Sequence, residues 1–285
     1  MKKLLLVLCF LPLLTEAQNF NFSLRAGLAS YAGDLKAKAF SLSQSSLMGS
    51  IGVRYDLTEH IALRSYFTLT SLKADDKKGT NTMKQRNLNF MTGIIDLEGG
   101  IHYSFLNLNY SWWTPYVFAG VGIYHFNPYT KDNSGAKTFL KPLSTEGEGF
   151  LPGVKNYKLT QLSIPVGFGA ERSLNEDTRL GIEVGYRKLF TDYLDDISDS
   201  YVDKNALLTA RGQQAVDLAY RGDKVGTGPY PAAGTPRGNP KHKDGYFYIA
   251  ITCTLRYFFD KYKQIVGLPS YKKEKRVGCP ATRQR

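Results

Sequence analysis

Residues 19–31 read NFNFSLRAGLASY, and apolar side chains alternate with polar or small ones along the whole stretch. Phe20, Leu24 and Leu28 fall on one face, whereas Asn21 and Arg25 fall on the other. Only a β-strand has a side-chain period of two. One face of this predicted strand is apolar enough to contact lipid, and the opposite face is polar enough to line an interior.

The same alternation returns along the chain, and none of these segments is long enough to be a membrane helix. Strands cross a bilayer only as a closed barrel, because lipid cannot satisfy unpaired backbone groups. The pattern therefore predicts an all-β fold, namely an eight-stranded antiparallel transmembrane β-barrel of the outer membrane. The expected strands are residues 19–31, 47–57, 61–73, 87–105, 114–126, 157–170, 178–190 and 245–259.

Short turns alternate with long loops between these strands. The turns are residues 58–60, 106–113 and 171–177, and the loops begin at residues 32, 74, 127 and 191. Bacterial barrels keep short turns in the periplasm and long loops outside the cell. We therefore expect long extracellular loops and both chain termini in the periplasm.

Three local features qualify this pattern. The phase of the alternation changes at Ile94–Ile95, which predicts a β-bulge. Pro165 falls within an expected strand, where a barrel tolerates proline near a bulge or a strand end. The longest loop, residues 191–244, contains four prolines among glycines and charges, shows no period, and is expected to be irregular.

The first 17 residues have the composition of an export signal. Lys2 and Lys3 precede an apolar run from Leu4 to Leu14, and Ala17 ends a small-residue cleavage site. Removal of this segment leaves 35 basic and 24 acidic side chains, a net charge of +11. We expect a signal peptide over 1–17, a barrel over 18–259 and a periplasmic tail over 260–285.

The predicted tail is strongly basic and contains one cysteine. Eight Lys or Arg residues against Asp260 and Glu274 give it a net charge of +6. An exported chain meets little nucleic acid, so we expect a protein or a lipid headgroup as partner, and a solvated tail without a partner stays open. Cys279 could form an intermolecular disulfide or stay a free thiol, whereas Cys253 is expected to face lipid. The candidate partner-binding residues are Lys272, Lys273, Lys275, Arg276 and Cys279.

Charged side chains also fall on the inward faces of the predicted strands. A barrel of eight strands is just wide enough for side chains to fill it, so we expect a plugged lumen and no open pore. Charges without bulk water must pair with one another, since an uncompensated buried charge is costly. We therefore predict structural ion pairs in which the acids Asp96, Glu98 and Glu183 meet the arginines Arg25, Arg54, Arg64, Arg179 and Arg187.

No catalytic or metal motif stands out. The four histidines lack metal-ligand spacing, and no phosphate-binding or dinucleotide fingerprint opens a helix. We therefore expect no enzyme, no cofactor and no metal; the one enzymatic alternative is lipid deacylation by His125 with a neighbouring Ser or Thr. Asp192, Asp195 and Asp196 either bind a cation or, as clustered loop acids more often do, keep the start of the loop solvated.

Several motifs together resemble one family. They are GLASYAGDL (27–35), YVFAGVGIYHFNP (116–128), LTQLSIP (159–165), EVGYRKLFTDYLDDIS (183–198), RGNP (237–240) and the late CP (279–280). The chain is similar over nearly its whole mature length to the PorG family, the outer-membrane barrel of the Bacteroidetes type IX secretion system. Residues 202–235 have no counterpart in the family pattern.

The resemblance implies a non-enzymatic part of a secretion machine. It implies an association from the periplasmic side with the ring that a lipoprotein and its soluble partner build, PorK and PorN in that family. An outer-membrane barrel that anchors this ring through its tail is our leading hypothesis. The alternatives are a narrow pore, a lipid-modifying barrel enzyme, and a surface-exposed structural or adhesion barrel that acts through the loop 191–244.

Overall fold

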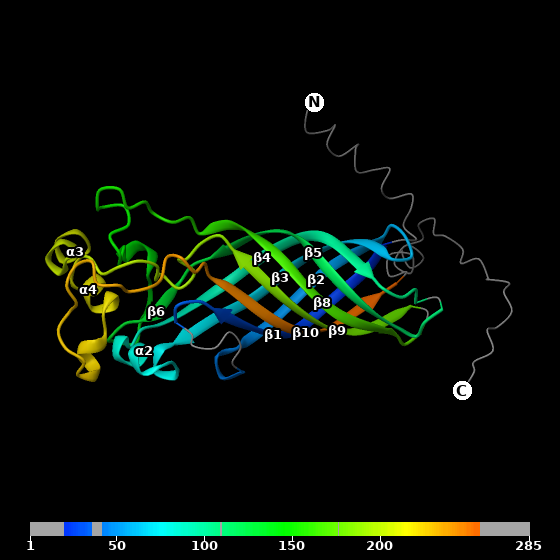
Figure 1. Ribbon diagram of the computed structural model, residues 1–285, viewed down its shortest axis with the longest axis horizontal. Coiled ribbons are helices and arrows are strands. Elements are labelled where there is room, and N and C mark those ends of the chain that lie inside the picture. Colours follow the sequence, from blue (N-terminus) through cyan, green and yellow to red (C-terminus); the bar gives the residue numbers. More distant parts are fainter. Residues whose placement is uncertain (1–19, 36–41, 109, 176, 257–285) are drawn as a thin grey trace, which may run out of the picture.

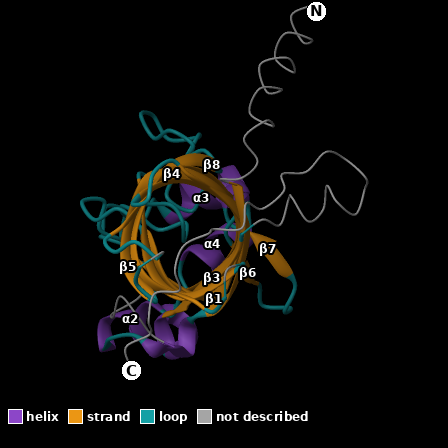
Figure 2. Ribbon diagram, turned by 90° about the vertical axis from the view of Figure 1, so that its right-hand side faces the viewer, coloured by secondary structure: helices purple, strands orange, loops and turns teal. Residues whose placement is uncertain are grey.

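The computed structural model describes residues 20–35, 42–108, 110–175 and 177–256. Eight long strands in this part of the chain form one antiparallel sheet, and pairing of β3 with β4 closes it into a barrel (Figures 1 and 2). The predicted fold class is therefore confirmed. The strands are β1 (Phe20–Ala32), β2 (Ser46–Asp56), β3 (Ile61–Asp75), β4 (Asn89–Ser104), β5 (Trp113–Phe126), β8 (Thr160–Ser173), β9 (Thr178–Leu189) and β10 (Gly245–Leu255).

The first and the last strand of the barrel pair with each other in antiparallel orientation. β1 pairs with β10 from Phe22 opposite Leu255 to Ala32 opposite Gly245. The other edge of β1 pairs with β2. Every long strand thus has a partner on both sides. The ladder leaves no open edge that lipid would have to cover, which is the condition for crossing a bilayer with strands.

Side chains alternate between the interior and the outer surface as the sequence predicts. On β10, Ile251 is 64% exposed whereas the next residue, Thr252, is 5% exposed. On β9, Ile182 points outward and Glu183 points inward. Large apolar side chains therefore form a belt around the barrel, and the middle of its interior is polar. This is the arrangement of an outer-membrane β-barrel, in which lipid, and not water, surrounds the apolar belt.

Two predicted irregularities differ in the structure. No bulge occurs at Ile94–Ile95, because β4 pairs with β3 in one unbroken register from Asn89 to Tyr103. Ile94 is instead buried inside the barrel while Ile95 faces out, so the prediction of a bulge was wrong. Pro165 lies in the middle of β8, where the pairing with β5 is interrupted between Ala119 and Gly122 and then resumes without a shift.

The two ends of the barrel differ. One end, here named the turn end, carries the short connections between β2 and β3, between β4 and β5, and between β8 and β9. The other, the loop end, carries a folded cap in which α2 (Asn81–Arg86), α3 (Lys204–Arg211), α4 (Gln213–Ala219) and a short hairpin of β6 (Tyr129–Lys131) with β7 (Lys137–Phe139) lie together (Figure 1). Short 3₁₀ turns complete it at Leu42–Gln44, Asp76–Lys78, Lys141–Leu143 and Gly222–Val225.

The loop 191–244 is more ordered than we expected. Asp203 caps α3 by accepting a hydrogen bond from the backbone of Ala206 at 2.9 Å, and Gly212 ends the helix with a φ of 84° that favours glycine. The prediction of an irregular loop was therefore wrong for this segment. None of the helices in the described part of the chain combines the length and apolar content needed to cross a membrane.

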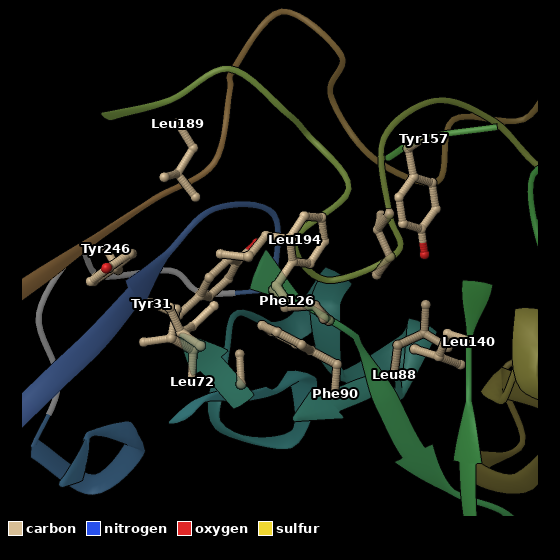
Figure 3. Packing of buried hydrophobic residues seen from close by; sticks show 14 of the residues in the cluster. Tyr31, Leu72, Leu88, Phe90, Phe126, Leu140, Tyr157, Leu189, Leu194 and Tyr246 are labelled. Atoms are coloured by element: carbon tan, nitrogen blue, oxygen red, sulfur yellow. The ribbon is translucent and has the colours of Figure 1, made fainter. Parts of the chain in front are cut away.

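An apolar cluster joins the cap to the barrel (Figure 3). Phe90 and Phe126 come from strands β4 and β5, whereas Leu194 comes from the loop that follows β9; all are at most 1% exposed. Burying such side chains stabilises the fold by about 1.5–3 kcal/mol each. The cap is therefore packed onto the barrel mouth and closes it.

Candidate functional site

Six charged side chains meet in the middle of the barrel and form what we call the lumen network. Its members are Arg25, Arg64, Asp96, Glu98, Glu183 and Arg187, and each comes from the inward face of its strand. Three positive charges thus face three negative charges. The set is balanced, as a buried group of charges must be to avoid a large desolvation cost.

Glu183 is the centre of the lumen network. It accepts hydrogen bonds from Arg25 at 2.8 Å, from two nitrogens of Arg64 at 2.8 and 3.0 Å, and from the hydroxyl groups of Tyr248 and Tyr116 at 2.6 and 3.0 Å. A carboxylate has about four lone-pair positions, so this one is fully used. No acceptor capacity remains on Glu183 for a substrate or a proton.

Glu98 and Asp96 complete the network on β4. Glu98 pairs with Arg25 and with Arg64, each at 3.2 Å, and also with Arg187. Asp96 pairs with Arg187 at 3.1 Å. Such mutual pairing at close range is the arrangement that the sequence predicts for this interior.

The guanidinium groups of the lumen network lie over the faces of aromatic rings. The Arg25 guanidinium lies 3.7 Å from the centre of the Tyr66 ring, and that of Arg64 lies 3.8 Å from the centre of the Phe118 ring. A cation over a ring face is attracted by the ring quadrupole, more strongly when water is excluded. The network is thus fixed by packing as well as by charge.

A second set of charges lies nearer the turn end. Arg54, which we grouped with the central residues, pairs with both oxygens of Glu171 at 3.0 and 3.1 Å and with Asp56 at 3.2 Å. Arg179 lies 3.6 Å from the same Glu171. Glu171 was missed because we placed it in a turn, although its inward parity with Gly167 and Gly169 on β8 could have revealed it.

A buried group of acids occupies the cap. The three aspartates that follow β9 are at most 2% exposed, so the prediction that they keep the loop solvated was wrong. Each accepts a hydroxyl hydrogen bond: Asp192 from Ser198 at 2.8 Å, Asp195 from Tyr31 at 2.6 Å, and Asp196 from Thr145 and Tyr157 at 2.7 Å each. No trio of His, Cys, Asp or Glu in the described residues is arranged to hold a metal ion.

Two of these acids share one hydroxyl group. Tyr31 contacts Asp195 at 2.6 Å and Asp244 at 2.8 Å. A hydroxyl carries a single proton, so the second contact requires a proton on one of the carboxyl groups. Burial raises the pKa of Asp195 and of Asp244 well above the usual range. Repulsion from Asp34 raises the pKa of Asp195 further, and repulsion from Asp195 raises that of Asp244.

Glu146 and Arg237 connect the cap internally. Glu146 accepts from the backbone of Ser198 at 3.0 Å and of Asp199 at 2.9 Å, and from Arg237 at 2.9 Å. Arg237 also donates to the carbonyl of Asp196 at 2.7 Å. These bonds join the segment after β9 to the segment before β10, and they hold the cap together over the barrel mouth.

The histidines occupy separate places. His125 is exposed on the outer face of β5 and lies 2.9 Å from the Thr160 hydroxyl, whereas His102 is buried, stacks on Tyr116 and lies 3.1 Å from the Ser104 hydroxyl. Cys253 faces outward on β10. The predicted tail residues Lys272, Lys273, Lys275, Arg276 and Cys279 and the signal segment 1–17 lie outside the described residues.

Residues 1–144, about half of the chain, match the family model described as a domain of unknown function, DUF6089. The chain belongs to the DUF6089 family. No curated protein matches this DUF6089 chain.

Several solved structures resemble the DUF6089 chain at low sequence identity. Neisserial surface protein A is 11% identical, with 84% of this chain and 97% of that chain covered and a TM-score of 0.42. OprG from Pseudomonas aeruginosa is 10% identical, with the same coverages and a TM-score of 0.42. Ail from Yersinia pestis is 8% identical, with 83% and 97% covered and a TM-score of 0.37.

Proposed function

We propose that this outer-membrane barrel is a non-enzymatic component of a type IX protein secretion system. In this proposal it anchors or organises the periplasmic ring of a lipoprotein and its soluble partner, of the PorK and PorN kind. Its two termini face the periplasm, and the basic tail 260–285 contacts the ring. The resemblance of its motifs to the PorG family is the basis for the secretion role.

The observation that carries the proposal is where those motifs lie. Tyr31 from the motif 27–35 binds Asp195 from the motif 183–198, and Arg237 from the motif 237–240 binds the backbone of Asp196. Glu183, in the same long motif, holds the lumen network together. The shared sequence thus builds one rigid, closed body, and rigidity is what an anchor for an assembly requires.

A pore is less well supported than an anchor. The side chains of Arg25, Glu98 and Glu183 are at most 2% exposed, so water has no access to the middle of the barrel. Ions cross a channel through wetted space, and eight strands leave little of it once side chains fill the lumen. A closed barrel offers its ends, and not its interior, as the places of action.

The proposal is tested by deletion of residues 260–285 in cells. We expect the ring proteins to be lost from the purified barrel while barrel insertion, followed by heat-dependent migration in electrophoresis, is unchanged. Ring proteins that still purify with the truncated barrel would reject the tail as the anchor.

The covalent contact is tested separately by non-reducing electrophoresis of outer membranes. We expect a heavier species that a reductant dissolves, and we expect Cys279→Ser to remove it. Cys253→Ser is the matched control, because this outward-facing cysteine should leave the species in place. A species that survives Cys279→Ser, or that never forms, would reject the disulfide.

A further inference from the structure

A cavity of about 360 Å³ opens at the turn end of the barrel. The turn after β2 and the turn after β4 form its rim, with Leu57 and Asn107 among the lining residues, and Arg54 and Arg179 form part of its wall. At about 30 Å³ for each water molecule, it holds on the order of ten waters. This space fits one or two side chains of another protein.

Arg179 lines this cavity and has no carboxylate within hydrogen-bond distance among the described residues. It is 9% exposed, its Nε has no hydrogen-bond partner among the described residues, and its nearest acid is Glu171 at 3.6 Å. That distance is too long for a hydrogen bond. A buried guanidinium nitrogen without a partner is costly, and no carboxylate lies within hydrogen-bond distance of Arg179 among the described residues, so the site can take a further acceptor.

The neighbouring acids are already engaged. Both oxygens of Glu171 accept from Arg54, at 3.0 and 3.1 Å. Asp56 accepts from Asn21 at 2.9 Å and forms an ion pair with Arg54 at 3.2 Å. Two guanidinium groups therefore share one buried carboxylate. An additional oxygen acceptor placed in the cavity would satisfy Arg179 without breaking an existing pair.

We propose that this cavity receives the carboxylate of an Asp or Glu side chain presented by a periplasmic ring protein, with Arg179 as its principal ligand. Guanidinium and carboxylate groups match as a planar fork, which suits recognition of a single acidic side chain. The inference rests on the proposed function, because it places the turn end in the periplasm. It adds a second contact to the one made by the tail.

The rim explains why the ligand is carried by a protein. Asp56 and Glu59 line the same cavity as Arg54, Arg179 and Arg256, so its positive field is partly cancelled and concentrates free anions less than three arginines alone would. A carboxylate on a docked segment does not depend on that field, since the rest of the segment holds it in place. The basic tail and the cavity would then bind different parts of one acidic partner.

The chemistry of the site is tested on the full-length protein in detergent micelles with ¹⁵N-labelled arginine. Sodium acetate, compared with sodium chloride at equal ionic strength, should shift the Arg179 Nε–H resonance in a saturable way. Arg172, which faces outward with its guanidinium 4.7 Å from the Trp112 ring, is the control and should not respond. No saturable shift, or saturation by inorganic phosphate alone, would overturn the carboxylate site.

The partner is tested by photo-cross-linking in cells. A cross-linking residue at Leu57, which is 51% exposed on the rim, should capture a ring protein, whereas one at Leu208 on α3 at the opposite end should not. Arg179→Gln should lower the product from Leu57 about tenfold or more, because a charge-assisted hydrogen bond is lost. Arg179→Lys, which keeps the charge, should lower it less, and heat-dependent migration checks that both variants fold.

The outcomes separate this inference from the proposed function. A Leu57 product that is insensitive to Arg179→Gln, together with loss of the ring on tail deletion, would overturn the cavity site and leave the anchor in place. Capture of ring proteins from Leu208 in place of Leu57 would overturn both, because the barrel would then have the opposite orientation. Acetate binding without an Arg179-dependent product would overturn the assignment of the ligand to a ring protein.

Discussion

Replacing Glu183 by glutamine should destabilise the barrel more than any surface change of the same kind. Glutamine keeps the shape of glutamate but removes its charge and turns one oxygen into a donor. In Glu183→Gln, one of the two oxygens that accept from Arg25 and Arg64 at 2.8 Å would become an NH₂ group, and the negative charge that both guanidinium groups face would be lost. Removal of one partner from a buried ion pair costs about 3–5 kcal/mol, and we expect the unfolding free energy to fall by this amount.

The assay is urea unfolding in lipid vesicles, followed by tryptophan fluorescence. Trp112 and Trp113 are 64% and 41% exposed at the turn end and should report loss of the membrane environment. Linear extrapolation to water gives the free energy of unfolding for each variant. Glu59→Gln is the matched control, because Glu59 is exposed and a change there should stay within about 0.5 kcal/mol.

A double-mutant cycle with Arg64→Met sharpens the test. Each single variant leaves an unpaired buried charge, whereas the double variant removes one charge of each sign, so it should cost less than the two single variants together. If Glu183→Gln cost no more than Glu59→Gln, the interior would be wet in solution. Buried ion pairs would then not be what stabilises the barrel.

Three further outcomes are expected. Burial, with repulsion from Asp196, raises the pKa of Glu148 from 4.5 to about 8, so the cap should lose stability progressively between these two pH values and not further above them. Glu148→Gln, which imitates the protonated acid, should remove this dependence in limited proteolysis of the loop 191–244. Single-channel recordings in planar bilayers should show almost no current, because side chains fill the lumen. Gly185→Ala should cost about 1–3 kcal/mol because its new methyl group would clash with the Tyr248 ring, whereas Gly93→Ala has open space and should be neutral in urea unfolding.

Each of these outcomes has a clear opposite. Proteolysis of the Glu148→Gln cap that still increased as the pH rose from 4.5 to about 8 would assign the titration to another acid. Steady conductance steps from the purified barrel would reopen the pore hypothesis. Equal stability of the two glycine variants would mean that Tyr248 does not fill the space beside Gly185 in solution.

The sequence alone was sufficient for the barrel and for the direction of almost every strand side chain. A period of two is a local property, so Glu183 must point away from the side to which Ile182 points whatever the neighbouring strands are. The same rule placed the arginines inside. It was misapplied at Ile94–Ile95, where the loop-end interior is apolar and an inward isoleucine looked like a change of phase.

Only the tertiary structure decided which charges meet and how the loops fold. Glu171 and Arg54 are 117 positions apart, and their pairing depends on which strands face each other across the lumen and on the stagger between them. Asp195 and Tyr31 are 164 positions apart and meet only when the cap packs on the barrel mouth. Alternation determines whether a side chain faces in or out. Its partner depends on how the sheet closes, and closure depends on all the strands together and not on any single segment of sequence.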